Sequence, residues 1–195
     1  MITKIIKDLI TFIKVKANHL NSGGANYIGF DVKFVNRGTI TLGKSVIIHP
    51  STRVYAGNYR SLVSFGNGTE IGEHSTISSN NSIVLGNDVL TGPHIFIADH
   101  NHAYENLSLP VSKQGVKCNT TDEVVIGDGS WLGTNVVIVG NVHIGKHCVI
   151  GANSVVTKDI PDYSVAAGIP AKVIKRYDIE RKEWIKVNKQ TDNSL

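Results

Sequence analysis

Aliphatic side chains recur at every sixth position in the second half of the chain. The residue after each of them is mostly glycine, and the residue four places later is small or of modest size. An α-helix repeats its apolar face every 3.6 residues and a strand every two, so neither explains a period of six held over this stretch. The six aliphatic positions are Ile126, Leu132, Ile138, Ile144, Ile150 and Val156.

The fourth position of each hexapeptide predicts a corner. It holds Gly, Asn, His or Asp, and of these Gly, Asn and Asp best tolerate a positive φ. A chain that turns at every hexapeptide closes a triangular coil in about 18 residues, and successive coils stack as parallel strands about 4.8 Å apart. The aliphatic residues then point into the coil. The predicted corners are Gly129, Asn135, Asn141, His147, Asn153 and Asp159.

The same spacing occurs less regularly in the first half of the chain and breaks between Ile97 and Ile126. We expect residues 98–123 to form a loop that leaves the coil, and loops on rigid scaffolds often carry function. This segment contains the sequence DHNH at residues 99–102. The earlier members of the pattern are Leu42, Ile48, Val54, Phe65, Ile71, Ile77 and Ile83.

Both ends of the chain depart from the hexapeptide pattern. An apolar stripe from Ile2 to Ile13, at helical spacing, predicts an amphipathic helix within residues 1–20. This helix either caps the open end of the coil, whose strand edge is otherwise bare, or lies on a membrane surface through residues 1–16. Residues 21–174 are expected to form the coil. Residues 175–195 are expected to form a helical tail, with a helix from Asp178 to Lys189.

The composition fits one folded domain with appendages. The chain of 195 residues is 41% hydrophobic and 18% charged, which excludes a disordered protein. No apolar run approaches the roughly 18 residues of a membrane-spanning helix. The net charge of +4 suits an anionic small ligand, although solubility alone explains so mild an excess. We find no nucleic-acid-binding motif, and the aromatic residues are too scattered for a base-stacking surface.

Two features of the sequence concern its compartment. The two cysteines, Cys118 and Cys148, are not a disulfide framework, which favours a reducing compartment. Lysines interrupt every apolar stretch of residues 1–16, unlike in a secretion signal. We therefore expect a cytoplasmic protein, located at the inner face of the membrane if its N-terminal helix is peripheral.

Several segments resemble one superfamily. Together with DHNH, the segments IGDGSWLGTNVVI, IGANSVVTKDIP and AAGIPAKVIK resemble the left-handed β-helix acyltransferases over residues 28–175. These include the maltose, galactoside and nodulation-factor O-acetyltransferases, the streptogramin-type xenobiotic acetyltransferases and the polysaccharide O-acetyltransferases. The resemblance implies an all-β, left-handed parallel β-helix, acetyl-CoA as co-substrate, and a homotrimer whose sites are each shared by two subunits. Periodicity alone predicts the coil but not its hand.

Histidine is the natural general base for acetyl transfer from coenzyme A to a hydroxyl, since its unperturbed pKa of about 6.5 lies near working pH. Of the eight histidines, only His100 and His102 fall in the predicted loop. The superfamily places its catalytic histidine there, and His100 matches the motif position. His102 is interpreted as a substrate-lining or plain loop residue. The residues alone leave open whether Asp99, Asp88 or a backbone carbonyl orients His100.

The resemblance also implies which residues bind coenzyme A, along the β-helix in a cleft between subunits. Thr134 and Ala152 occupy equivalent positions on successive coils, where their backbone groups could bond the pantetheine. The Thr134 amide is the expected oxyanion donor. The lysines either meet the phosphates as point charges or are solvated surface residues. The set is Thr134, Ala152, Thr157, Lys158, Lys172 and Lys175.

The acceptor side departs from the maltose-type pattern, in which an Asn two coils before the base helps to bind the acceptor. The corresponding position here is Gly72, so we do not expect an acceptor like maltose or a simple galactoside. Trp131 either lines the pocket or packs on the outer face under the loop. The candidate acceptor residues are Glu73, His74, His102, Tyr104, Glu105 and Trp131.

We expect no metal and no cysteine catalysis. A zinc site like that of the γ-carbonic anhydrases needs histidines in the same slot of neighbouring coil edges, whereas His143 and His147 lie in different slots. Cys148 occupies an inward slot and should behave as a small hydrophobe. No neighbour of Cys118 suggests an activated thiolate.

The leading hypothesis is an acetyl-CoA-dependent O-acetyltransferase that acts on a sugar hydroxyl of a bacterial surface polysaccharide or its lipid-linked precursor. An N-acetyltransferase of a nucleotide-linked amino sugar would use the same coil and donor. Acetylation of a xenobiotic is a third hypothesis. The non-enzymatic alternative is a β-helix kept as an assembly scaffold, which the loss of the loop histidine would have favoured; His100 is present.

Overall fold

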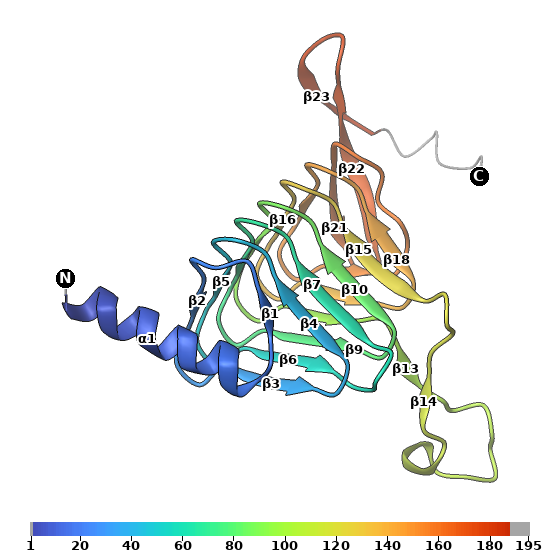
Figure 1. Ribbon diagram of the computed structural model, residues 1–195. Coiled ribbons are helices and arrows are strands. Elements are labelled where there is room, and N and C mark those ends of the chain that lie inside the picture. Colours follow the sequence, from blue (N-terminus) through green and yellow to red (C-terminus); the bar gives the residue numbers. More distant parts are fainter. Residues whose placement is uncertain (1, 188–195) are drawn as a thin grey trace.

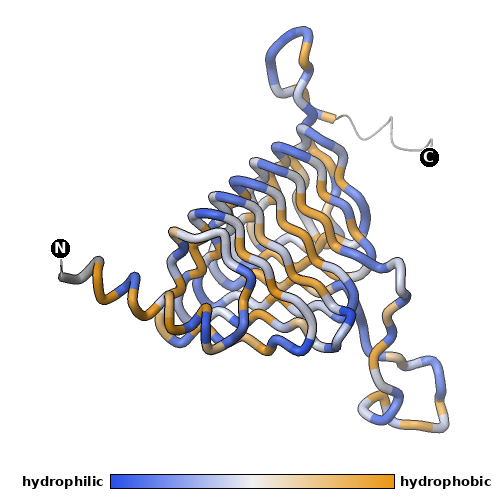
Figure 2. The backbone as a smooth tube through the Cα atoms, viewed as in Figure 1, coloured by the Kyte–Doolittle hydropathy of each residue, from blue (hydrophilic) through white to orange (hydrophobic). Residues whose placement is uncertain are grey.

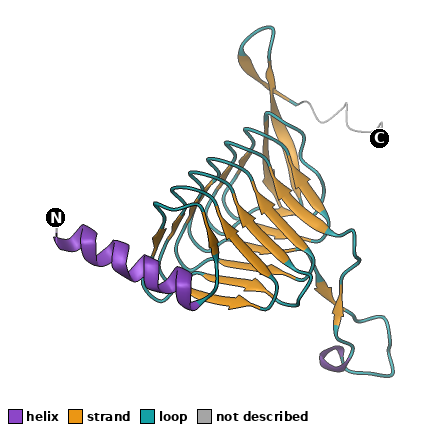
Figure 3. Cartoon of the chain, viewed as in Figure 1, coloured by secondary structure: helices purple, strands orange, loops and turns teal. Residues whose placement is uncertain are grey.

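The chain folds into a stack of triangular coils, as Figure 1 shows for the computed structural model, which describes residues 2–187. Three sheets form the faces of the resulting prism, a left-handed parallel β-helix (Figure 3). We name them sheets A, B and C in the order in which each coil visits them. The chain passes from one sheet to the next at three corners.

Sheet A consists of β1 (Asn21–Ser22), β4 (Thr39–Leu42), β7 (Leu62–Phe65), β10 (Ser82–Leu85), β15 (Glu123–Ile126) and β18 (Val142–Ile144). Sheet B consists of β2 (Tyr27–Ile28), β5 (Ile47–Ile48), β8 (Glu70–Ile71), β11 (Leu90–Thr91), β16 (Trp131–Leu132), β19 (Val149–Ile150), β21 (Ser164–Gly168), β22 (Ala171–Asp178) and β23 (Glu183–Lys186). Sheet C consists of β3 (Lys33–Asn36), β6 (Arg53–Ala56), β9 (Thr76–Ser79), β12 (Phe96–Ala98), β17 (Val137–Val139) and β20 (Val155–Val156).

The interior of the coil confirms the hexapeptide core. The six aliphatic residues from Ile126 to Val156 are all buried, and so are the earlier members of the pattern. Each side chain stacks on its counterpart in the next coil, as Leu132 does between Thr91 and Ile150. The core is therefore a column of aliphatic side chains that runs the length of the stack.

The predicted coil of 18 residues is correct only near the C-terminal end of the stack. Ile138 pairs with Val156, eighteen positions later. Earlier in the chain Val63 pairs with Ile83 after twenty positions, and Ile40 pairs with Val63 after twenty-three. The early coils are longer because strands such as β9 and β10 have four residues, whereas β17 and β18 have three.

Residues with positive φ recur on successive coils at two of the three corners. Two predicted corners, Asn141 and Asp159, do not have the left-handed conformation. Both lie between sheets C and A, where Gly140 takes a positive φ of 91° instead and the turn is of another type. The left-handed residues between sheets A and B include Ser45, Gly68, Asp88, Gly129, His147 and Tyr163. Those between sheets B and C include Asp31, Ser51, His74, His94, Asn135 and Asn153.

The glycine that follows each core residue is required by the close approach of neighbouring coils. A Cβ atom at Gly72 would lie 2.3 Å from the Gly92 carbonyl oxygen, and one at Gly133 would lie 2.6 Å from the Ala152 nitrogen. Real side chains do not tolerate such distances to backbone atoms. The second hexapeptide position therefore serves stacking, while the fourth position makes the turn.

The helix α1 (Ile2–Ala17) lies across the N-terminal end of the stack and contacts it through Thr11, Lys14 and the partly buried Val15. Thr11 is only 6% exposed, and its hydroxyl oxygen accepts a hydrogen bond of 3.1 Å from the Ile28 N–H. The Lys14 ammonium donates to the Gly29 carbonyl. The end of a parallel coil presents backbone donors and acceptors that have no next strand, so polar side chains are the groups that satisfy them.

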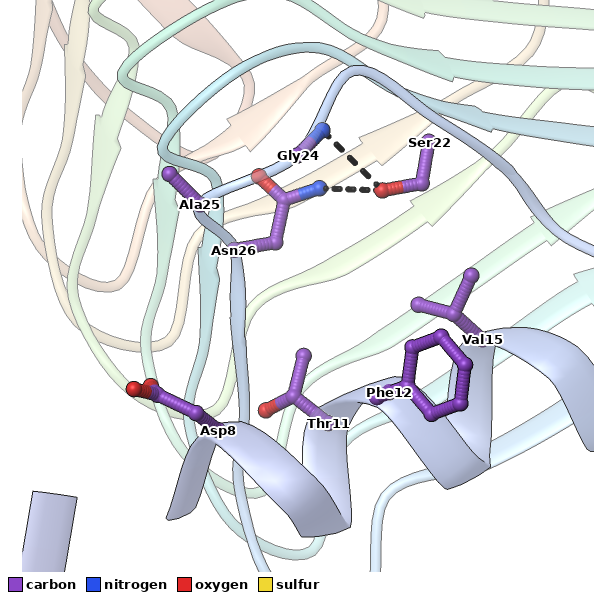
Figure 4. Close-up of a pocket in the computed structure, with 8 residues that line it drawn as sticks. All are labelled: Asp8, Thr11, Phe12, Val15, Ser22, Gly24, Ala25 and Asn26. Carbon is purple, nitrogen blue, oxygen red and sulfur yellow. Dashed lines mark hydrogen bonds between the residues drawn. The ribbon is translucent and has the colours of Figure 1, made fainter. Parts of the chain in front are cut away.

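The predicted apolar stripe of α1 faces away from the stack, which corrects the interpretation that this stripe covers the open end. From Ile5 to Ile13 its aliphatic side chains are between 42% and 60% exposed. A cavity of about 490 Å³ lies between the helix and residues 22–26, with Asp8, Thr11 and Val15 among its walls (Figure 4). No helix within residues 2–187 is long and apolar enough to cross a membrane.

The predicted C-terminal helix is wrong over the residues that the structure describes. β22 and β23 form an antiparallel hairpin that extends sheet B from β21. Tyr177 and Trp184 face each other across the hairpin in an edge-to-face arrangement with centroids 5.4 Å apart. The last coil offers a free strand edge, and pairing with it satisfies the backbone of β22 in a way that a helix could not. Residues 188 and 189 of the predicted helix lie outside the described residues.

Candidate active site

His100 lies where the chain leaves the stack. β12 ends at Ala98, and the next residue, Asp99, is fully buried. The His100 side chain is 20% exposed, and its Nδ1 atom lies 2.9 Å from Asp99 Oδ1. When Nδ1–H donates to this carboxylate, the lone pair resides on Nε2, which can then accept a proton.

Asp99 is held in place by the preceding coil. The Ser79 hydroxyl donates to its Oδ2 (2.7 Å), and the N–H groups of Asn80 and Asn81 donate to Oδ1 (2.8 Å) and Oδ2 (2.9 Å). Burial raises the pKa of Asp99, but the hydrogen bonds from His100, Asn80, Ser79 and Asn81 outweigh it, so the pKa lies below its usual value. The question left open by the sequence is thus answered: the Asp99 carboxylate orients His100.

Asn80 and Asn81 and the hydroxyl of Ser79 are site residues that the sequence analysis missed. Ser78 pairs with Ala98 across β9 and β12, which places Ser79 beside Asp99. The available signal was a run of small polar residues, Ser-Ser-Asn-Asn at 78–81, one coil before the break in register. Asp88, the other carboxylate considered, lies exposed at the corner between sheets A and B.

The loop begins as a two-stranded antiparallel hairpin of β13 (Asn101–His102) and β14 (Val116–Lys117), with a short 3-10 helix at Val111–Lys113. His102 and Tyr104 are exposed on it. Glu105 forms an ion pair with Lys117, which lowers the pKa of the Glu105 carboxyl to about 2. The Glu105 carboxylate is therefore paired with another residue of the loop.

The two ends of the loop are tied to the stack beside Asp99. The Asn81 side-chain amide donates to the carbonyl oxygens of Thr120 (3.0 Å) and Asp122 (2.7 Å). The Cys118 sulfur lies 3.7 Å from the Asp99 carbonyl oxygen. The segment around His100 is thus anchored on both sides, although most of the loop projects into solvent (Figure 1).

The structure does not bring Glu73 and His74 together with the loop residues in one chain. Both lie at the corner between sheets B and C, whereas His100 follows β12 at the far end of sheet C. His74 stacks on His94 of the next coil, with ring centroids 5.1 Å apart. Gly72 has no room for a side chain, as described above, so an acceptor-binding Asn could not be accommodated there.

Thr134 and Ala152 lie next to each other on successive coils, at the corner between sheets B and C. The Asn153 N–H donates to the Thr134 carbonyl (2.9 Å). Among the described residues, the Thr134 amide has no hydrogen-bond acceptor, and its nitrogen lies close to Gly92 of the preceding coil. Lys172 lies near this pair at the same corner. It pairs with Ala167, and the Ala167 side chain lies beside Gly151.

Thr157 and Lys158 are exposed at the opposite end of sheet C, after β20. Lys175 lies on β22 directly opposite Lys186 of β23. Apart from Lys175, which lies within sheet B, the candidate donor residues form two polar groups, with the outer face of sheet C between them. That face carries the partly exposed side chains of Phe96, Val137 and Val155.

Trp131 lies on the outer face of sheet B, between Leu90 and Val149 of the neighbouring coils, and is 49% exposed. The loop leaves from the corner between sheets C and A, so it does not cover Trp131. Within residues 2–187 no three side chains of His, Cys, Asp or Glu gather as metal ligands would.

The sequence matches proteins that are named as acetyltransferases. The family described as "Bacterial transferase hexapeptide (six repeats)" matches residues 123–158. A protein of Escherichia coli named as a lipopolysaccharide biosynthesis O-acetyl transferase, WbbJ, is 36% identical over 163 residues, which cover 82% of this chain and 83% of that protein. The galactoside O-acetyltransferase of Escherichia coli is 30% identical over 155 residues, 80% of this chain and 72% of that protein.

Solved structures show the same fold. A variant of AntD, an N-acyltransferase from Bacillus cereus in complex with dTDP and coenzyme A, superposes with a TM-score of 0.70 over 86% of this chain and 90% of that one. Its sequence is 18% identical. At that identity the likeness concerns the fold alone.

Proposed function

The chain belongs to the hexapeptide-repeat acyltransferases, and on this premise we propose that it is an O-acetyltransferase that acetylates a sugar hydroxyl with His100 as general base. The protein is an acyltransferase that uses acetyl-CoA as co-substrate. The observation that carries the proposal is the buried Asp99 carboxylate, which fixes the His100 imidazole with Nε2 available.

In the proposed reaction His100 Nε2 accepts the proton of the acceptor hydroxyl as its oxygen attacks the thioester carbonyl. The new C–O bond forms and the C–S bond breaks, and the proton passes from His100 to the departing thiolate. Asp99 stabilises the transient imidazolium, and the Thr134 amide is the candidate donor to the oxyanion. No step needs a metal or an external oxidant.

We propose a polysaccharide or its lipid-linked precursor as the acceptor. Support comes from the O-acetyl transferase named for lipopolysaccharide biosynthesis, which matches over most of both chains. N-acylation of a nucleotide-linked amino sugar is the second candidate, because the AntD complexes contain dTDP and coenzyme A. Screening hydroxyl and amine acceptors with a thiol-release assay separates the two. Turnover of amine acceptors alone would contradict O-acetylation, and turnover of small drugs alone would favour xenobiotic acetylation.

A homotrimer is the proposed assembly. In one chain His100 and the pair Thr134 and Ala152 lie at opposite ends of sheet C, so a site that combines base and donor cleft needs a neighbouring copy. Leu90, Phe96 and Trp131 are also exposed on the flat faces of the prism, which assembly would bury. A cytoplasmic location is proposed with it, since Cys118 and Cys148 are free thiols.

Replacement of the base tests the proposal. His100→Ala should lower kcat by about 10²- to 10⁴-fold, the usual effect of a positioned general base. The affinity for coenzyme A should hardly change, because the base faces the acceptor. His102→Ala should reduce kcat by less than about tenfold. Steady-state thiol release measures both variants, and thermal unfolding verifies the fold. An active His100 variant together with an inactive His102 variant would transfer the role to His102.

A further inference from the structure

The outward-facing helix α1 has an apolar surface that nothing in the described chain covers. Ile5, Ile6, Leu9, Ile10 and Ile13 form one continuous arc, since they recur at helical spacing, and all are exposed. Phe12, at the border of this arc, is 59% exposed. Figure 2 shows the hydrophobic residues along this helix, beyond the end of the prism.

The contacts of α1 with the stack fix which side faces outward. Thr11 and Lys14 hydrogen-bond to the backbone of the first coil at Ile28 and Gly29. Lys7 lies over the ring of Tyr27, with its nitrogen 5.4 Å from the centroid. Rotating the helix to bury its aliphatic side chains would break all three contacts. These contacts between the helix and the first coil therefore hold the apolar arc on the outer side of the helix.

The charge of the chain is concentrated at the same end. Residues 1–60, which form α1 and the first coils, contain nine Lys and Arg but only Asp8 and Asp31 as acidic residues, a net charge of +7. The remaining 135 residues carry a net charge of −3. The net charge of the whole chain is only mildly positive, but its N-terminal end is strongly basic. Lys16, Lys33 and Lys44 are exposed there.

We propose that α1 docks the protein onto an anionic lipid surface, with its aliphatic arc in the interface and the basic end of the stack against the headgroups. A helix with an apolar face and flanking lysines binds membranes in this way. A second copy of this chain is a poorer occupant. A symmetric contact would set two identical basic ends against each other, and like charges repel. The proposal goes beyond the acetyl-transfer reaction and does not depend on which acceptor is used.

Vesicle sedimentation of the full-length protein tests this docking. The wild type should bind vesicles of phosphatidylcholine with about one third phosphatidylglycerol at least about tenfold more strongly than vesicles of phosphatidylcholine alone, and salt should weaken the binding. Failure to bind the anionic vesicles would overturn the proposal.

A triple variant tests the role of the helix face. Ile6→Gln, Leu9→Gln and Ile13→Gln together should lower vesicle binding by about tenfold or more, and Gln preserves helix propensity. The matched control is Leu107→Gln with Ile179→Gln, which changes side chains that are even more exposed but lie on the loop and the C-terminal hairpin. Equal losses in both variants would exclude a specific role of α1.

Two measurements separate the remaining outcomes. Analytical ultracentrifugation should give the triple variant the oligomeric state of the wild type. Self-association of the wild type that the variant abolishes would assign the arc to a second copy and overturn lipid docking. Acetyl transfer to a soluble acceptor should be unchanged in the triple variant. Absence of transfer in the wild type would contradict the proposed reaction while leaving the vesicle result intact.

Discussion

At the scale of single residues, the site depends on a carboxylate that is buried yet ionised. Asp99 receives donors from a hydroxyl, two backbone amides and His100, so its charge is stabilised inside the coil. The imidazole is held in one orientation and one tautomer by a partner that cannot move, because that partner is fixed by the preceding coil.

Asp99→Asn should separate positioning from folding. The side-chain NH2 group of Asn cannot accept the hydrogen bonds that one carboxylate oxygen of Asp99 accepts. We therefore expect the unfolding free energy to fall by about 1–3 kcal/mol. We expect kcat to fall by about 10²-fold, with little change in KM for acetyl-CoA. Asp88→Asn, on an exposed carboxylate of the same coil, is the control. Kinetics and thermal unfolding measure the effects. A variant of Asp99 with unchanged kcat would contradict the positioning role.

The same carboxylate should make stability depend on pH. Because the pKa of Asp99 is lower in the folded protein than in the unfolded chain, its charge stabilises the fold above about pH 4, and this stabilisation is lost as pH falls through the folded pKa. Asp99→Asn should therefore lose less unfolding free energy than the wild type on acidification. Equal losses measured by denaturant titration would contradict this.

Sequence reasoning located His100 but not the residues that orient it. His100 stands just after the break in register and matches a family motif, which are local signals. The contact with Ser79 and Asn80 joins residues about twenty positions apart, and depends on how β12 pairs with β9. No local pattern reports whether a side chain folds back onto the previous coil.

At the scale of elements, hexapeptide periodicity predicted the core residues of most strands of the coil, from β4 to β12 and from β15 to β20, because one aliphatic residue per face must point inward. It did not predict that the early coils contain more than 18 residues. It also did not predict the conformation of the corner between sheets C and A, where Asn141 and Asp159 lack a positive φ. The helical reading of the C-terminal tail failed because β22 and β23 are stabilised by the free edge of the last coil. One prediction from the amphipathic pattern of α1 was that its apolar side covers the end of the coil. Instead, polar side chains of the helix contact the coil end, and the aliphatic side chains are exposed.

Gly72→Ala tests the steric role of the second hexapeptide position. The added methyl group would meet the Gly92 carbonyl at 2.3 Å, so we expect a loss of stability of about 1–3 kcal/mol or more. Gly57→Ala is the matched control, with its nearest contact at 3.2 Å from the Ser79 oxygen. Chemical denaturation measures both. Similar losses would show that loss of glycine, not contact between coils, is the cause.

At the scale of the whole molecule, the candidate donor residues other than Lys175 lie in two groups at the ends of sheet C. Changing Lys158 and Lys172 together to Ala should raise KM for acetyl-CoA by about tenfold, with a smaller effect on kcat, because contacts remote from the thioester act on ground and transition states alike. Lys33→Ala with Lys44→Ala removes the same charge at the other end of the stack. An unchanged KM in the first variant would show that the phosphates bind elsewhere.

The assembly is tested by light scattering across a range of protein concentrations. We expect a trimer, because base and donor cleft are at opposite ends of one sheet within a chain. Activity per subunit should fall when dilution dissociates the trimer, since each site needs two subunits. A stable and fully active monomer would contradict both the assembly and the shared site.

The loop has a consequence for how such proteins change over time. Ile83 of β10 pairs with Val124 of β15, forty-one positions later, so the loop between β12 and β15 lengthens this coil without disturbing the pairing of its strands. Both ends of the loop leave from one corner, and lengthening a loop costs only about 0.6 kcal/mol per doubling. The length and sequence of the loop can therefore change while the strands of the stack keep their pairing. Insertions, deletions and recombination within it can diversify what is recognised next to His100, while the scaffold keeps the same fold and loses little stability.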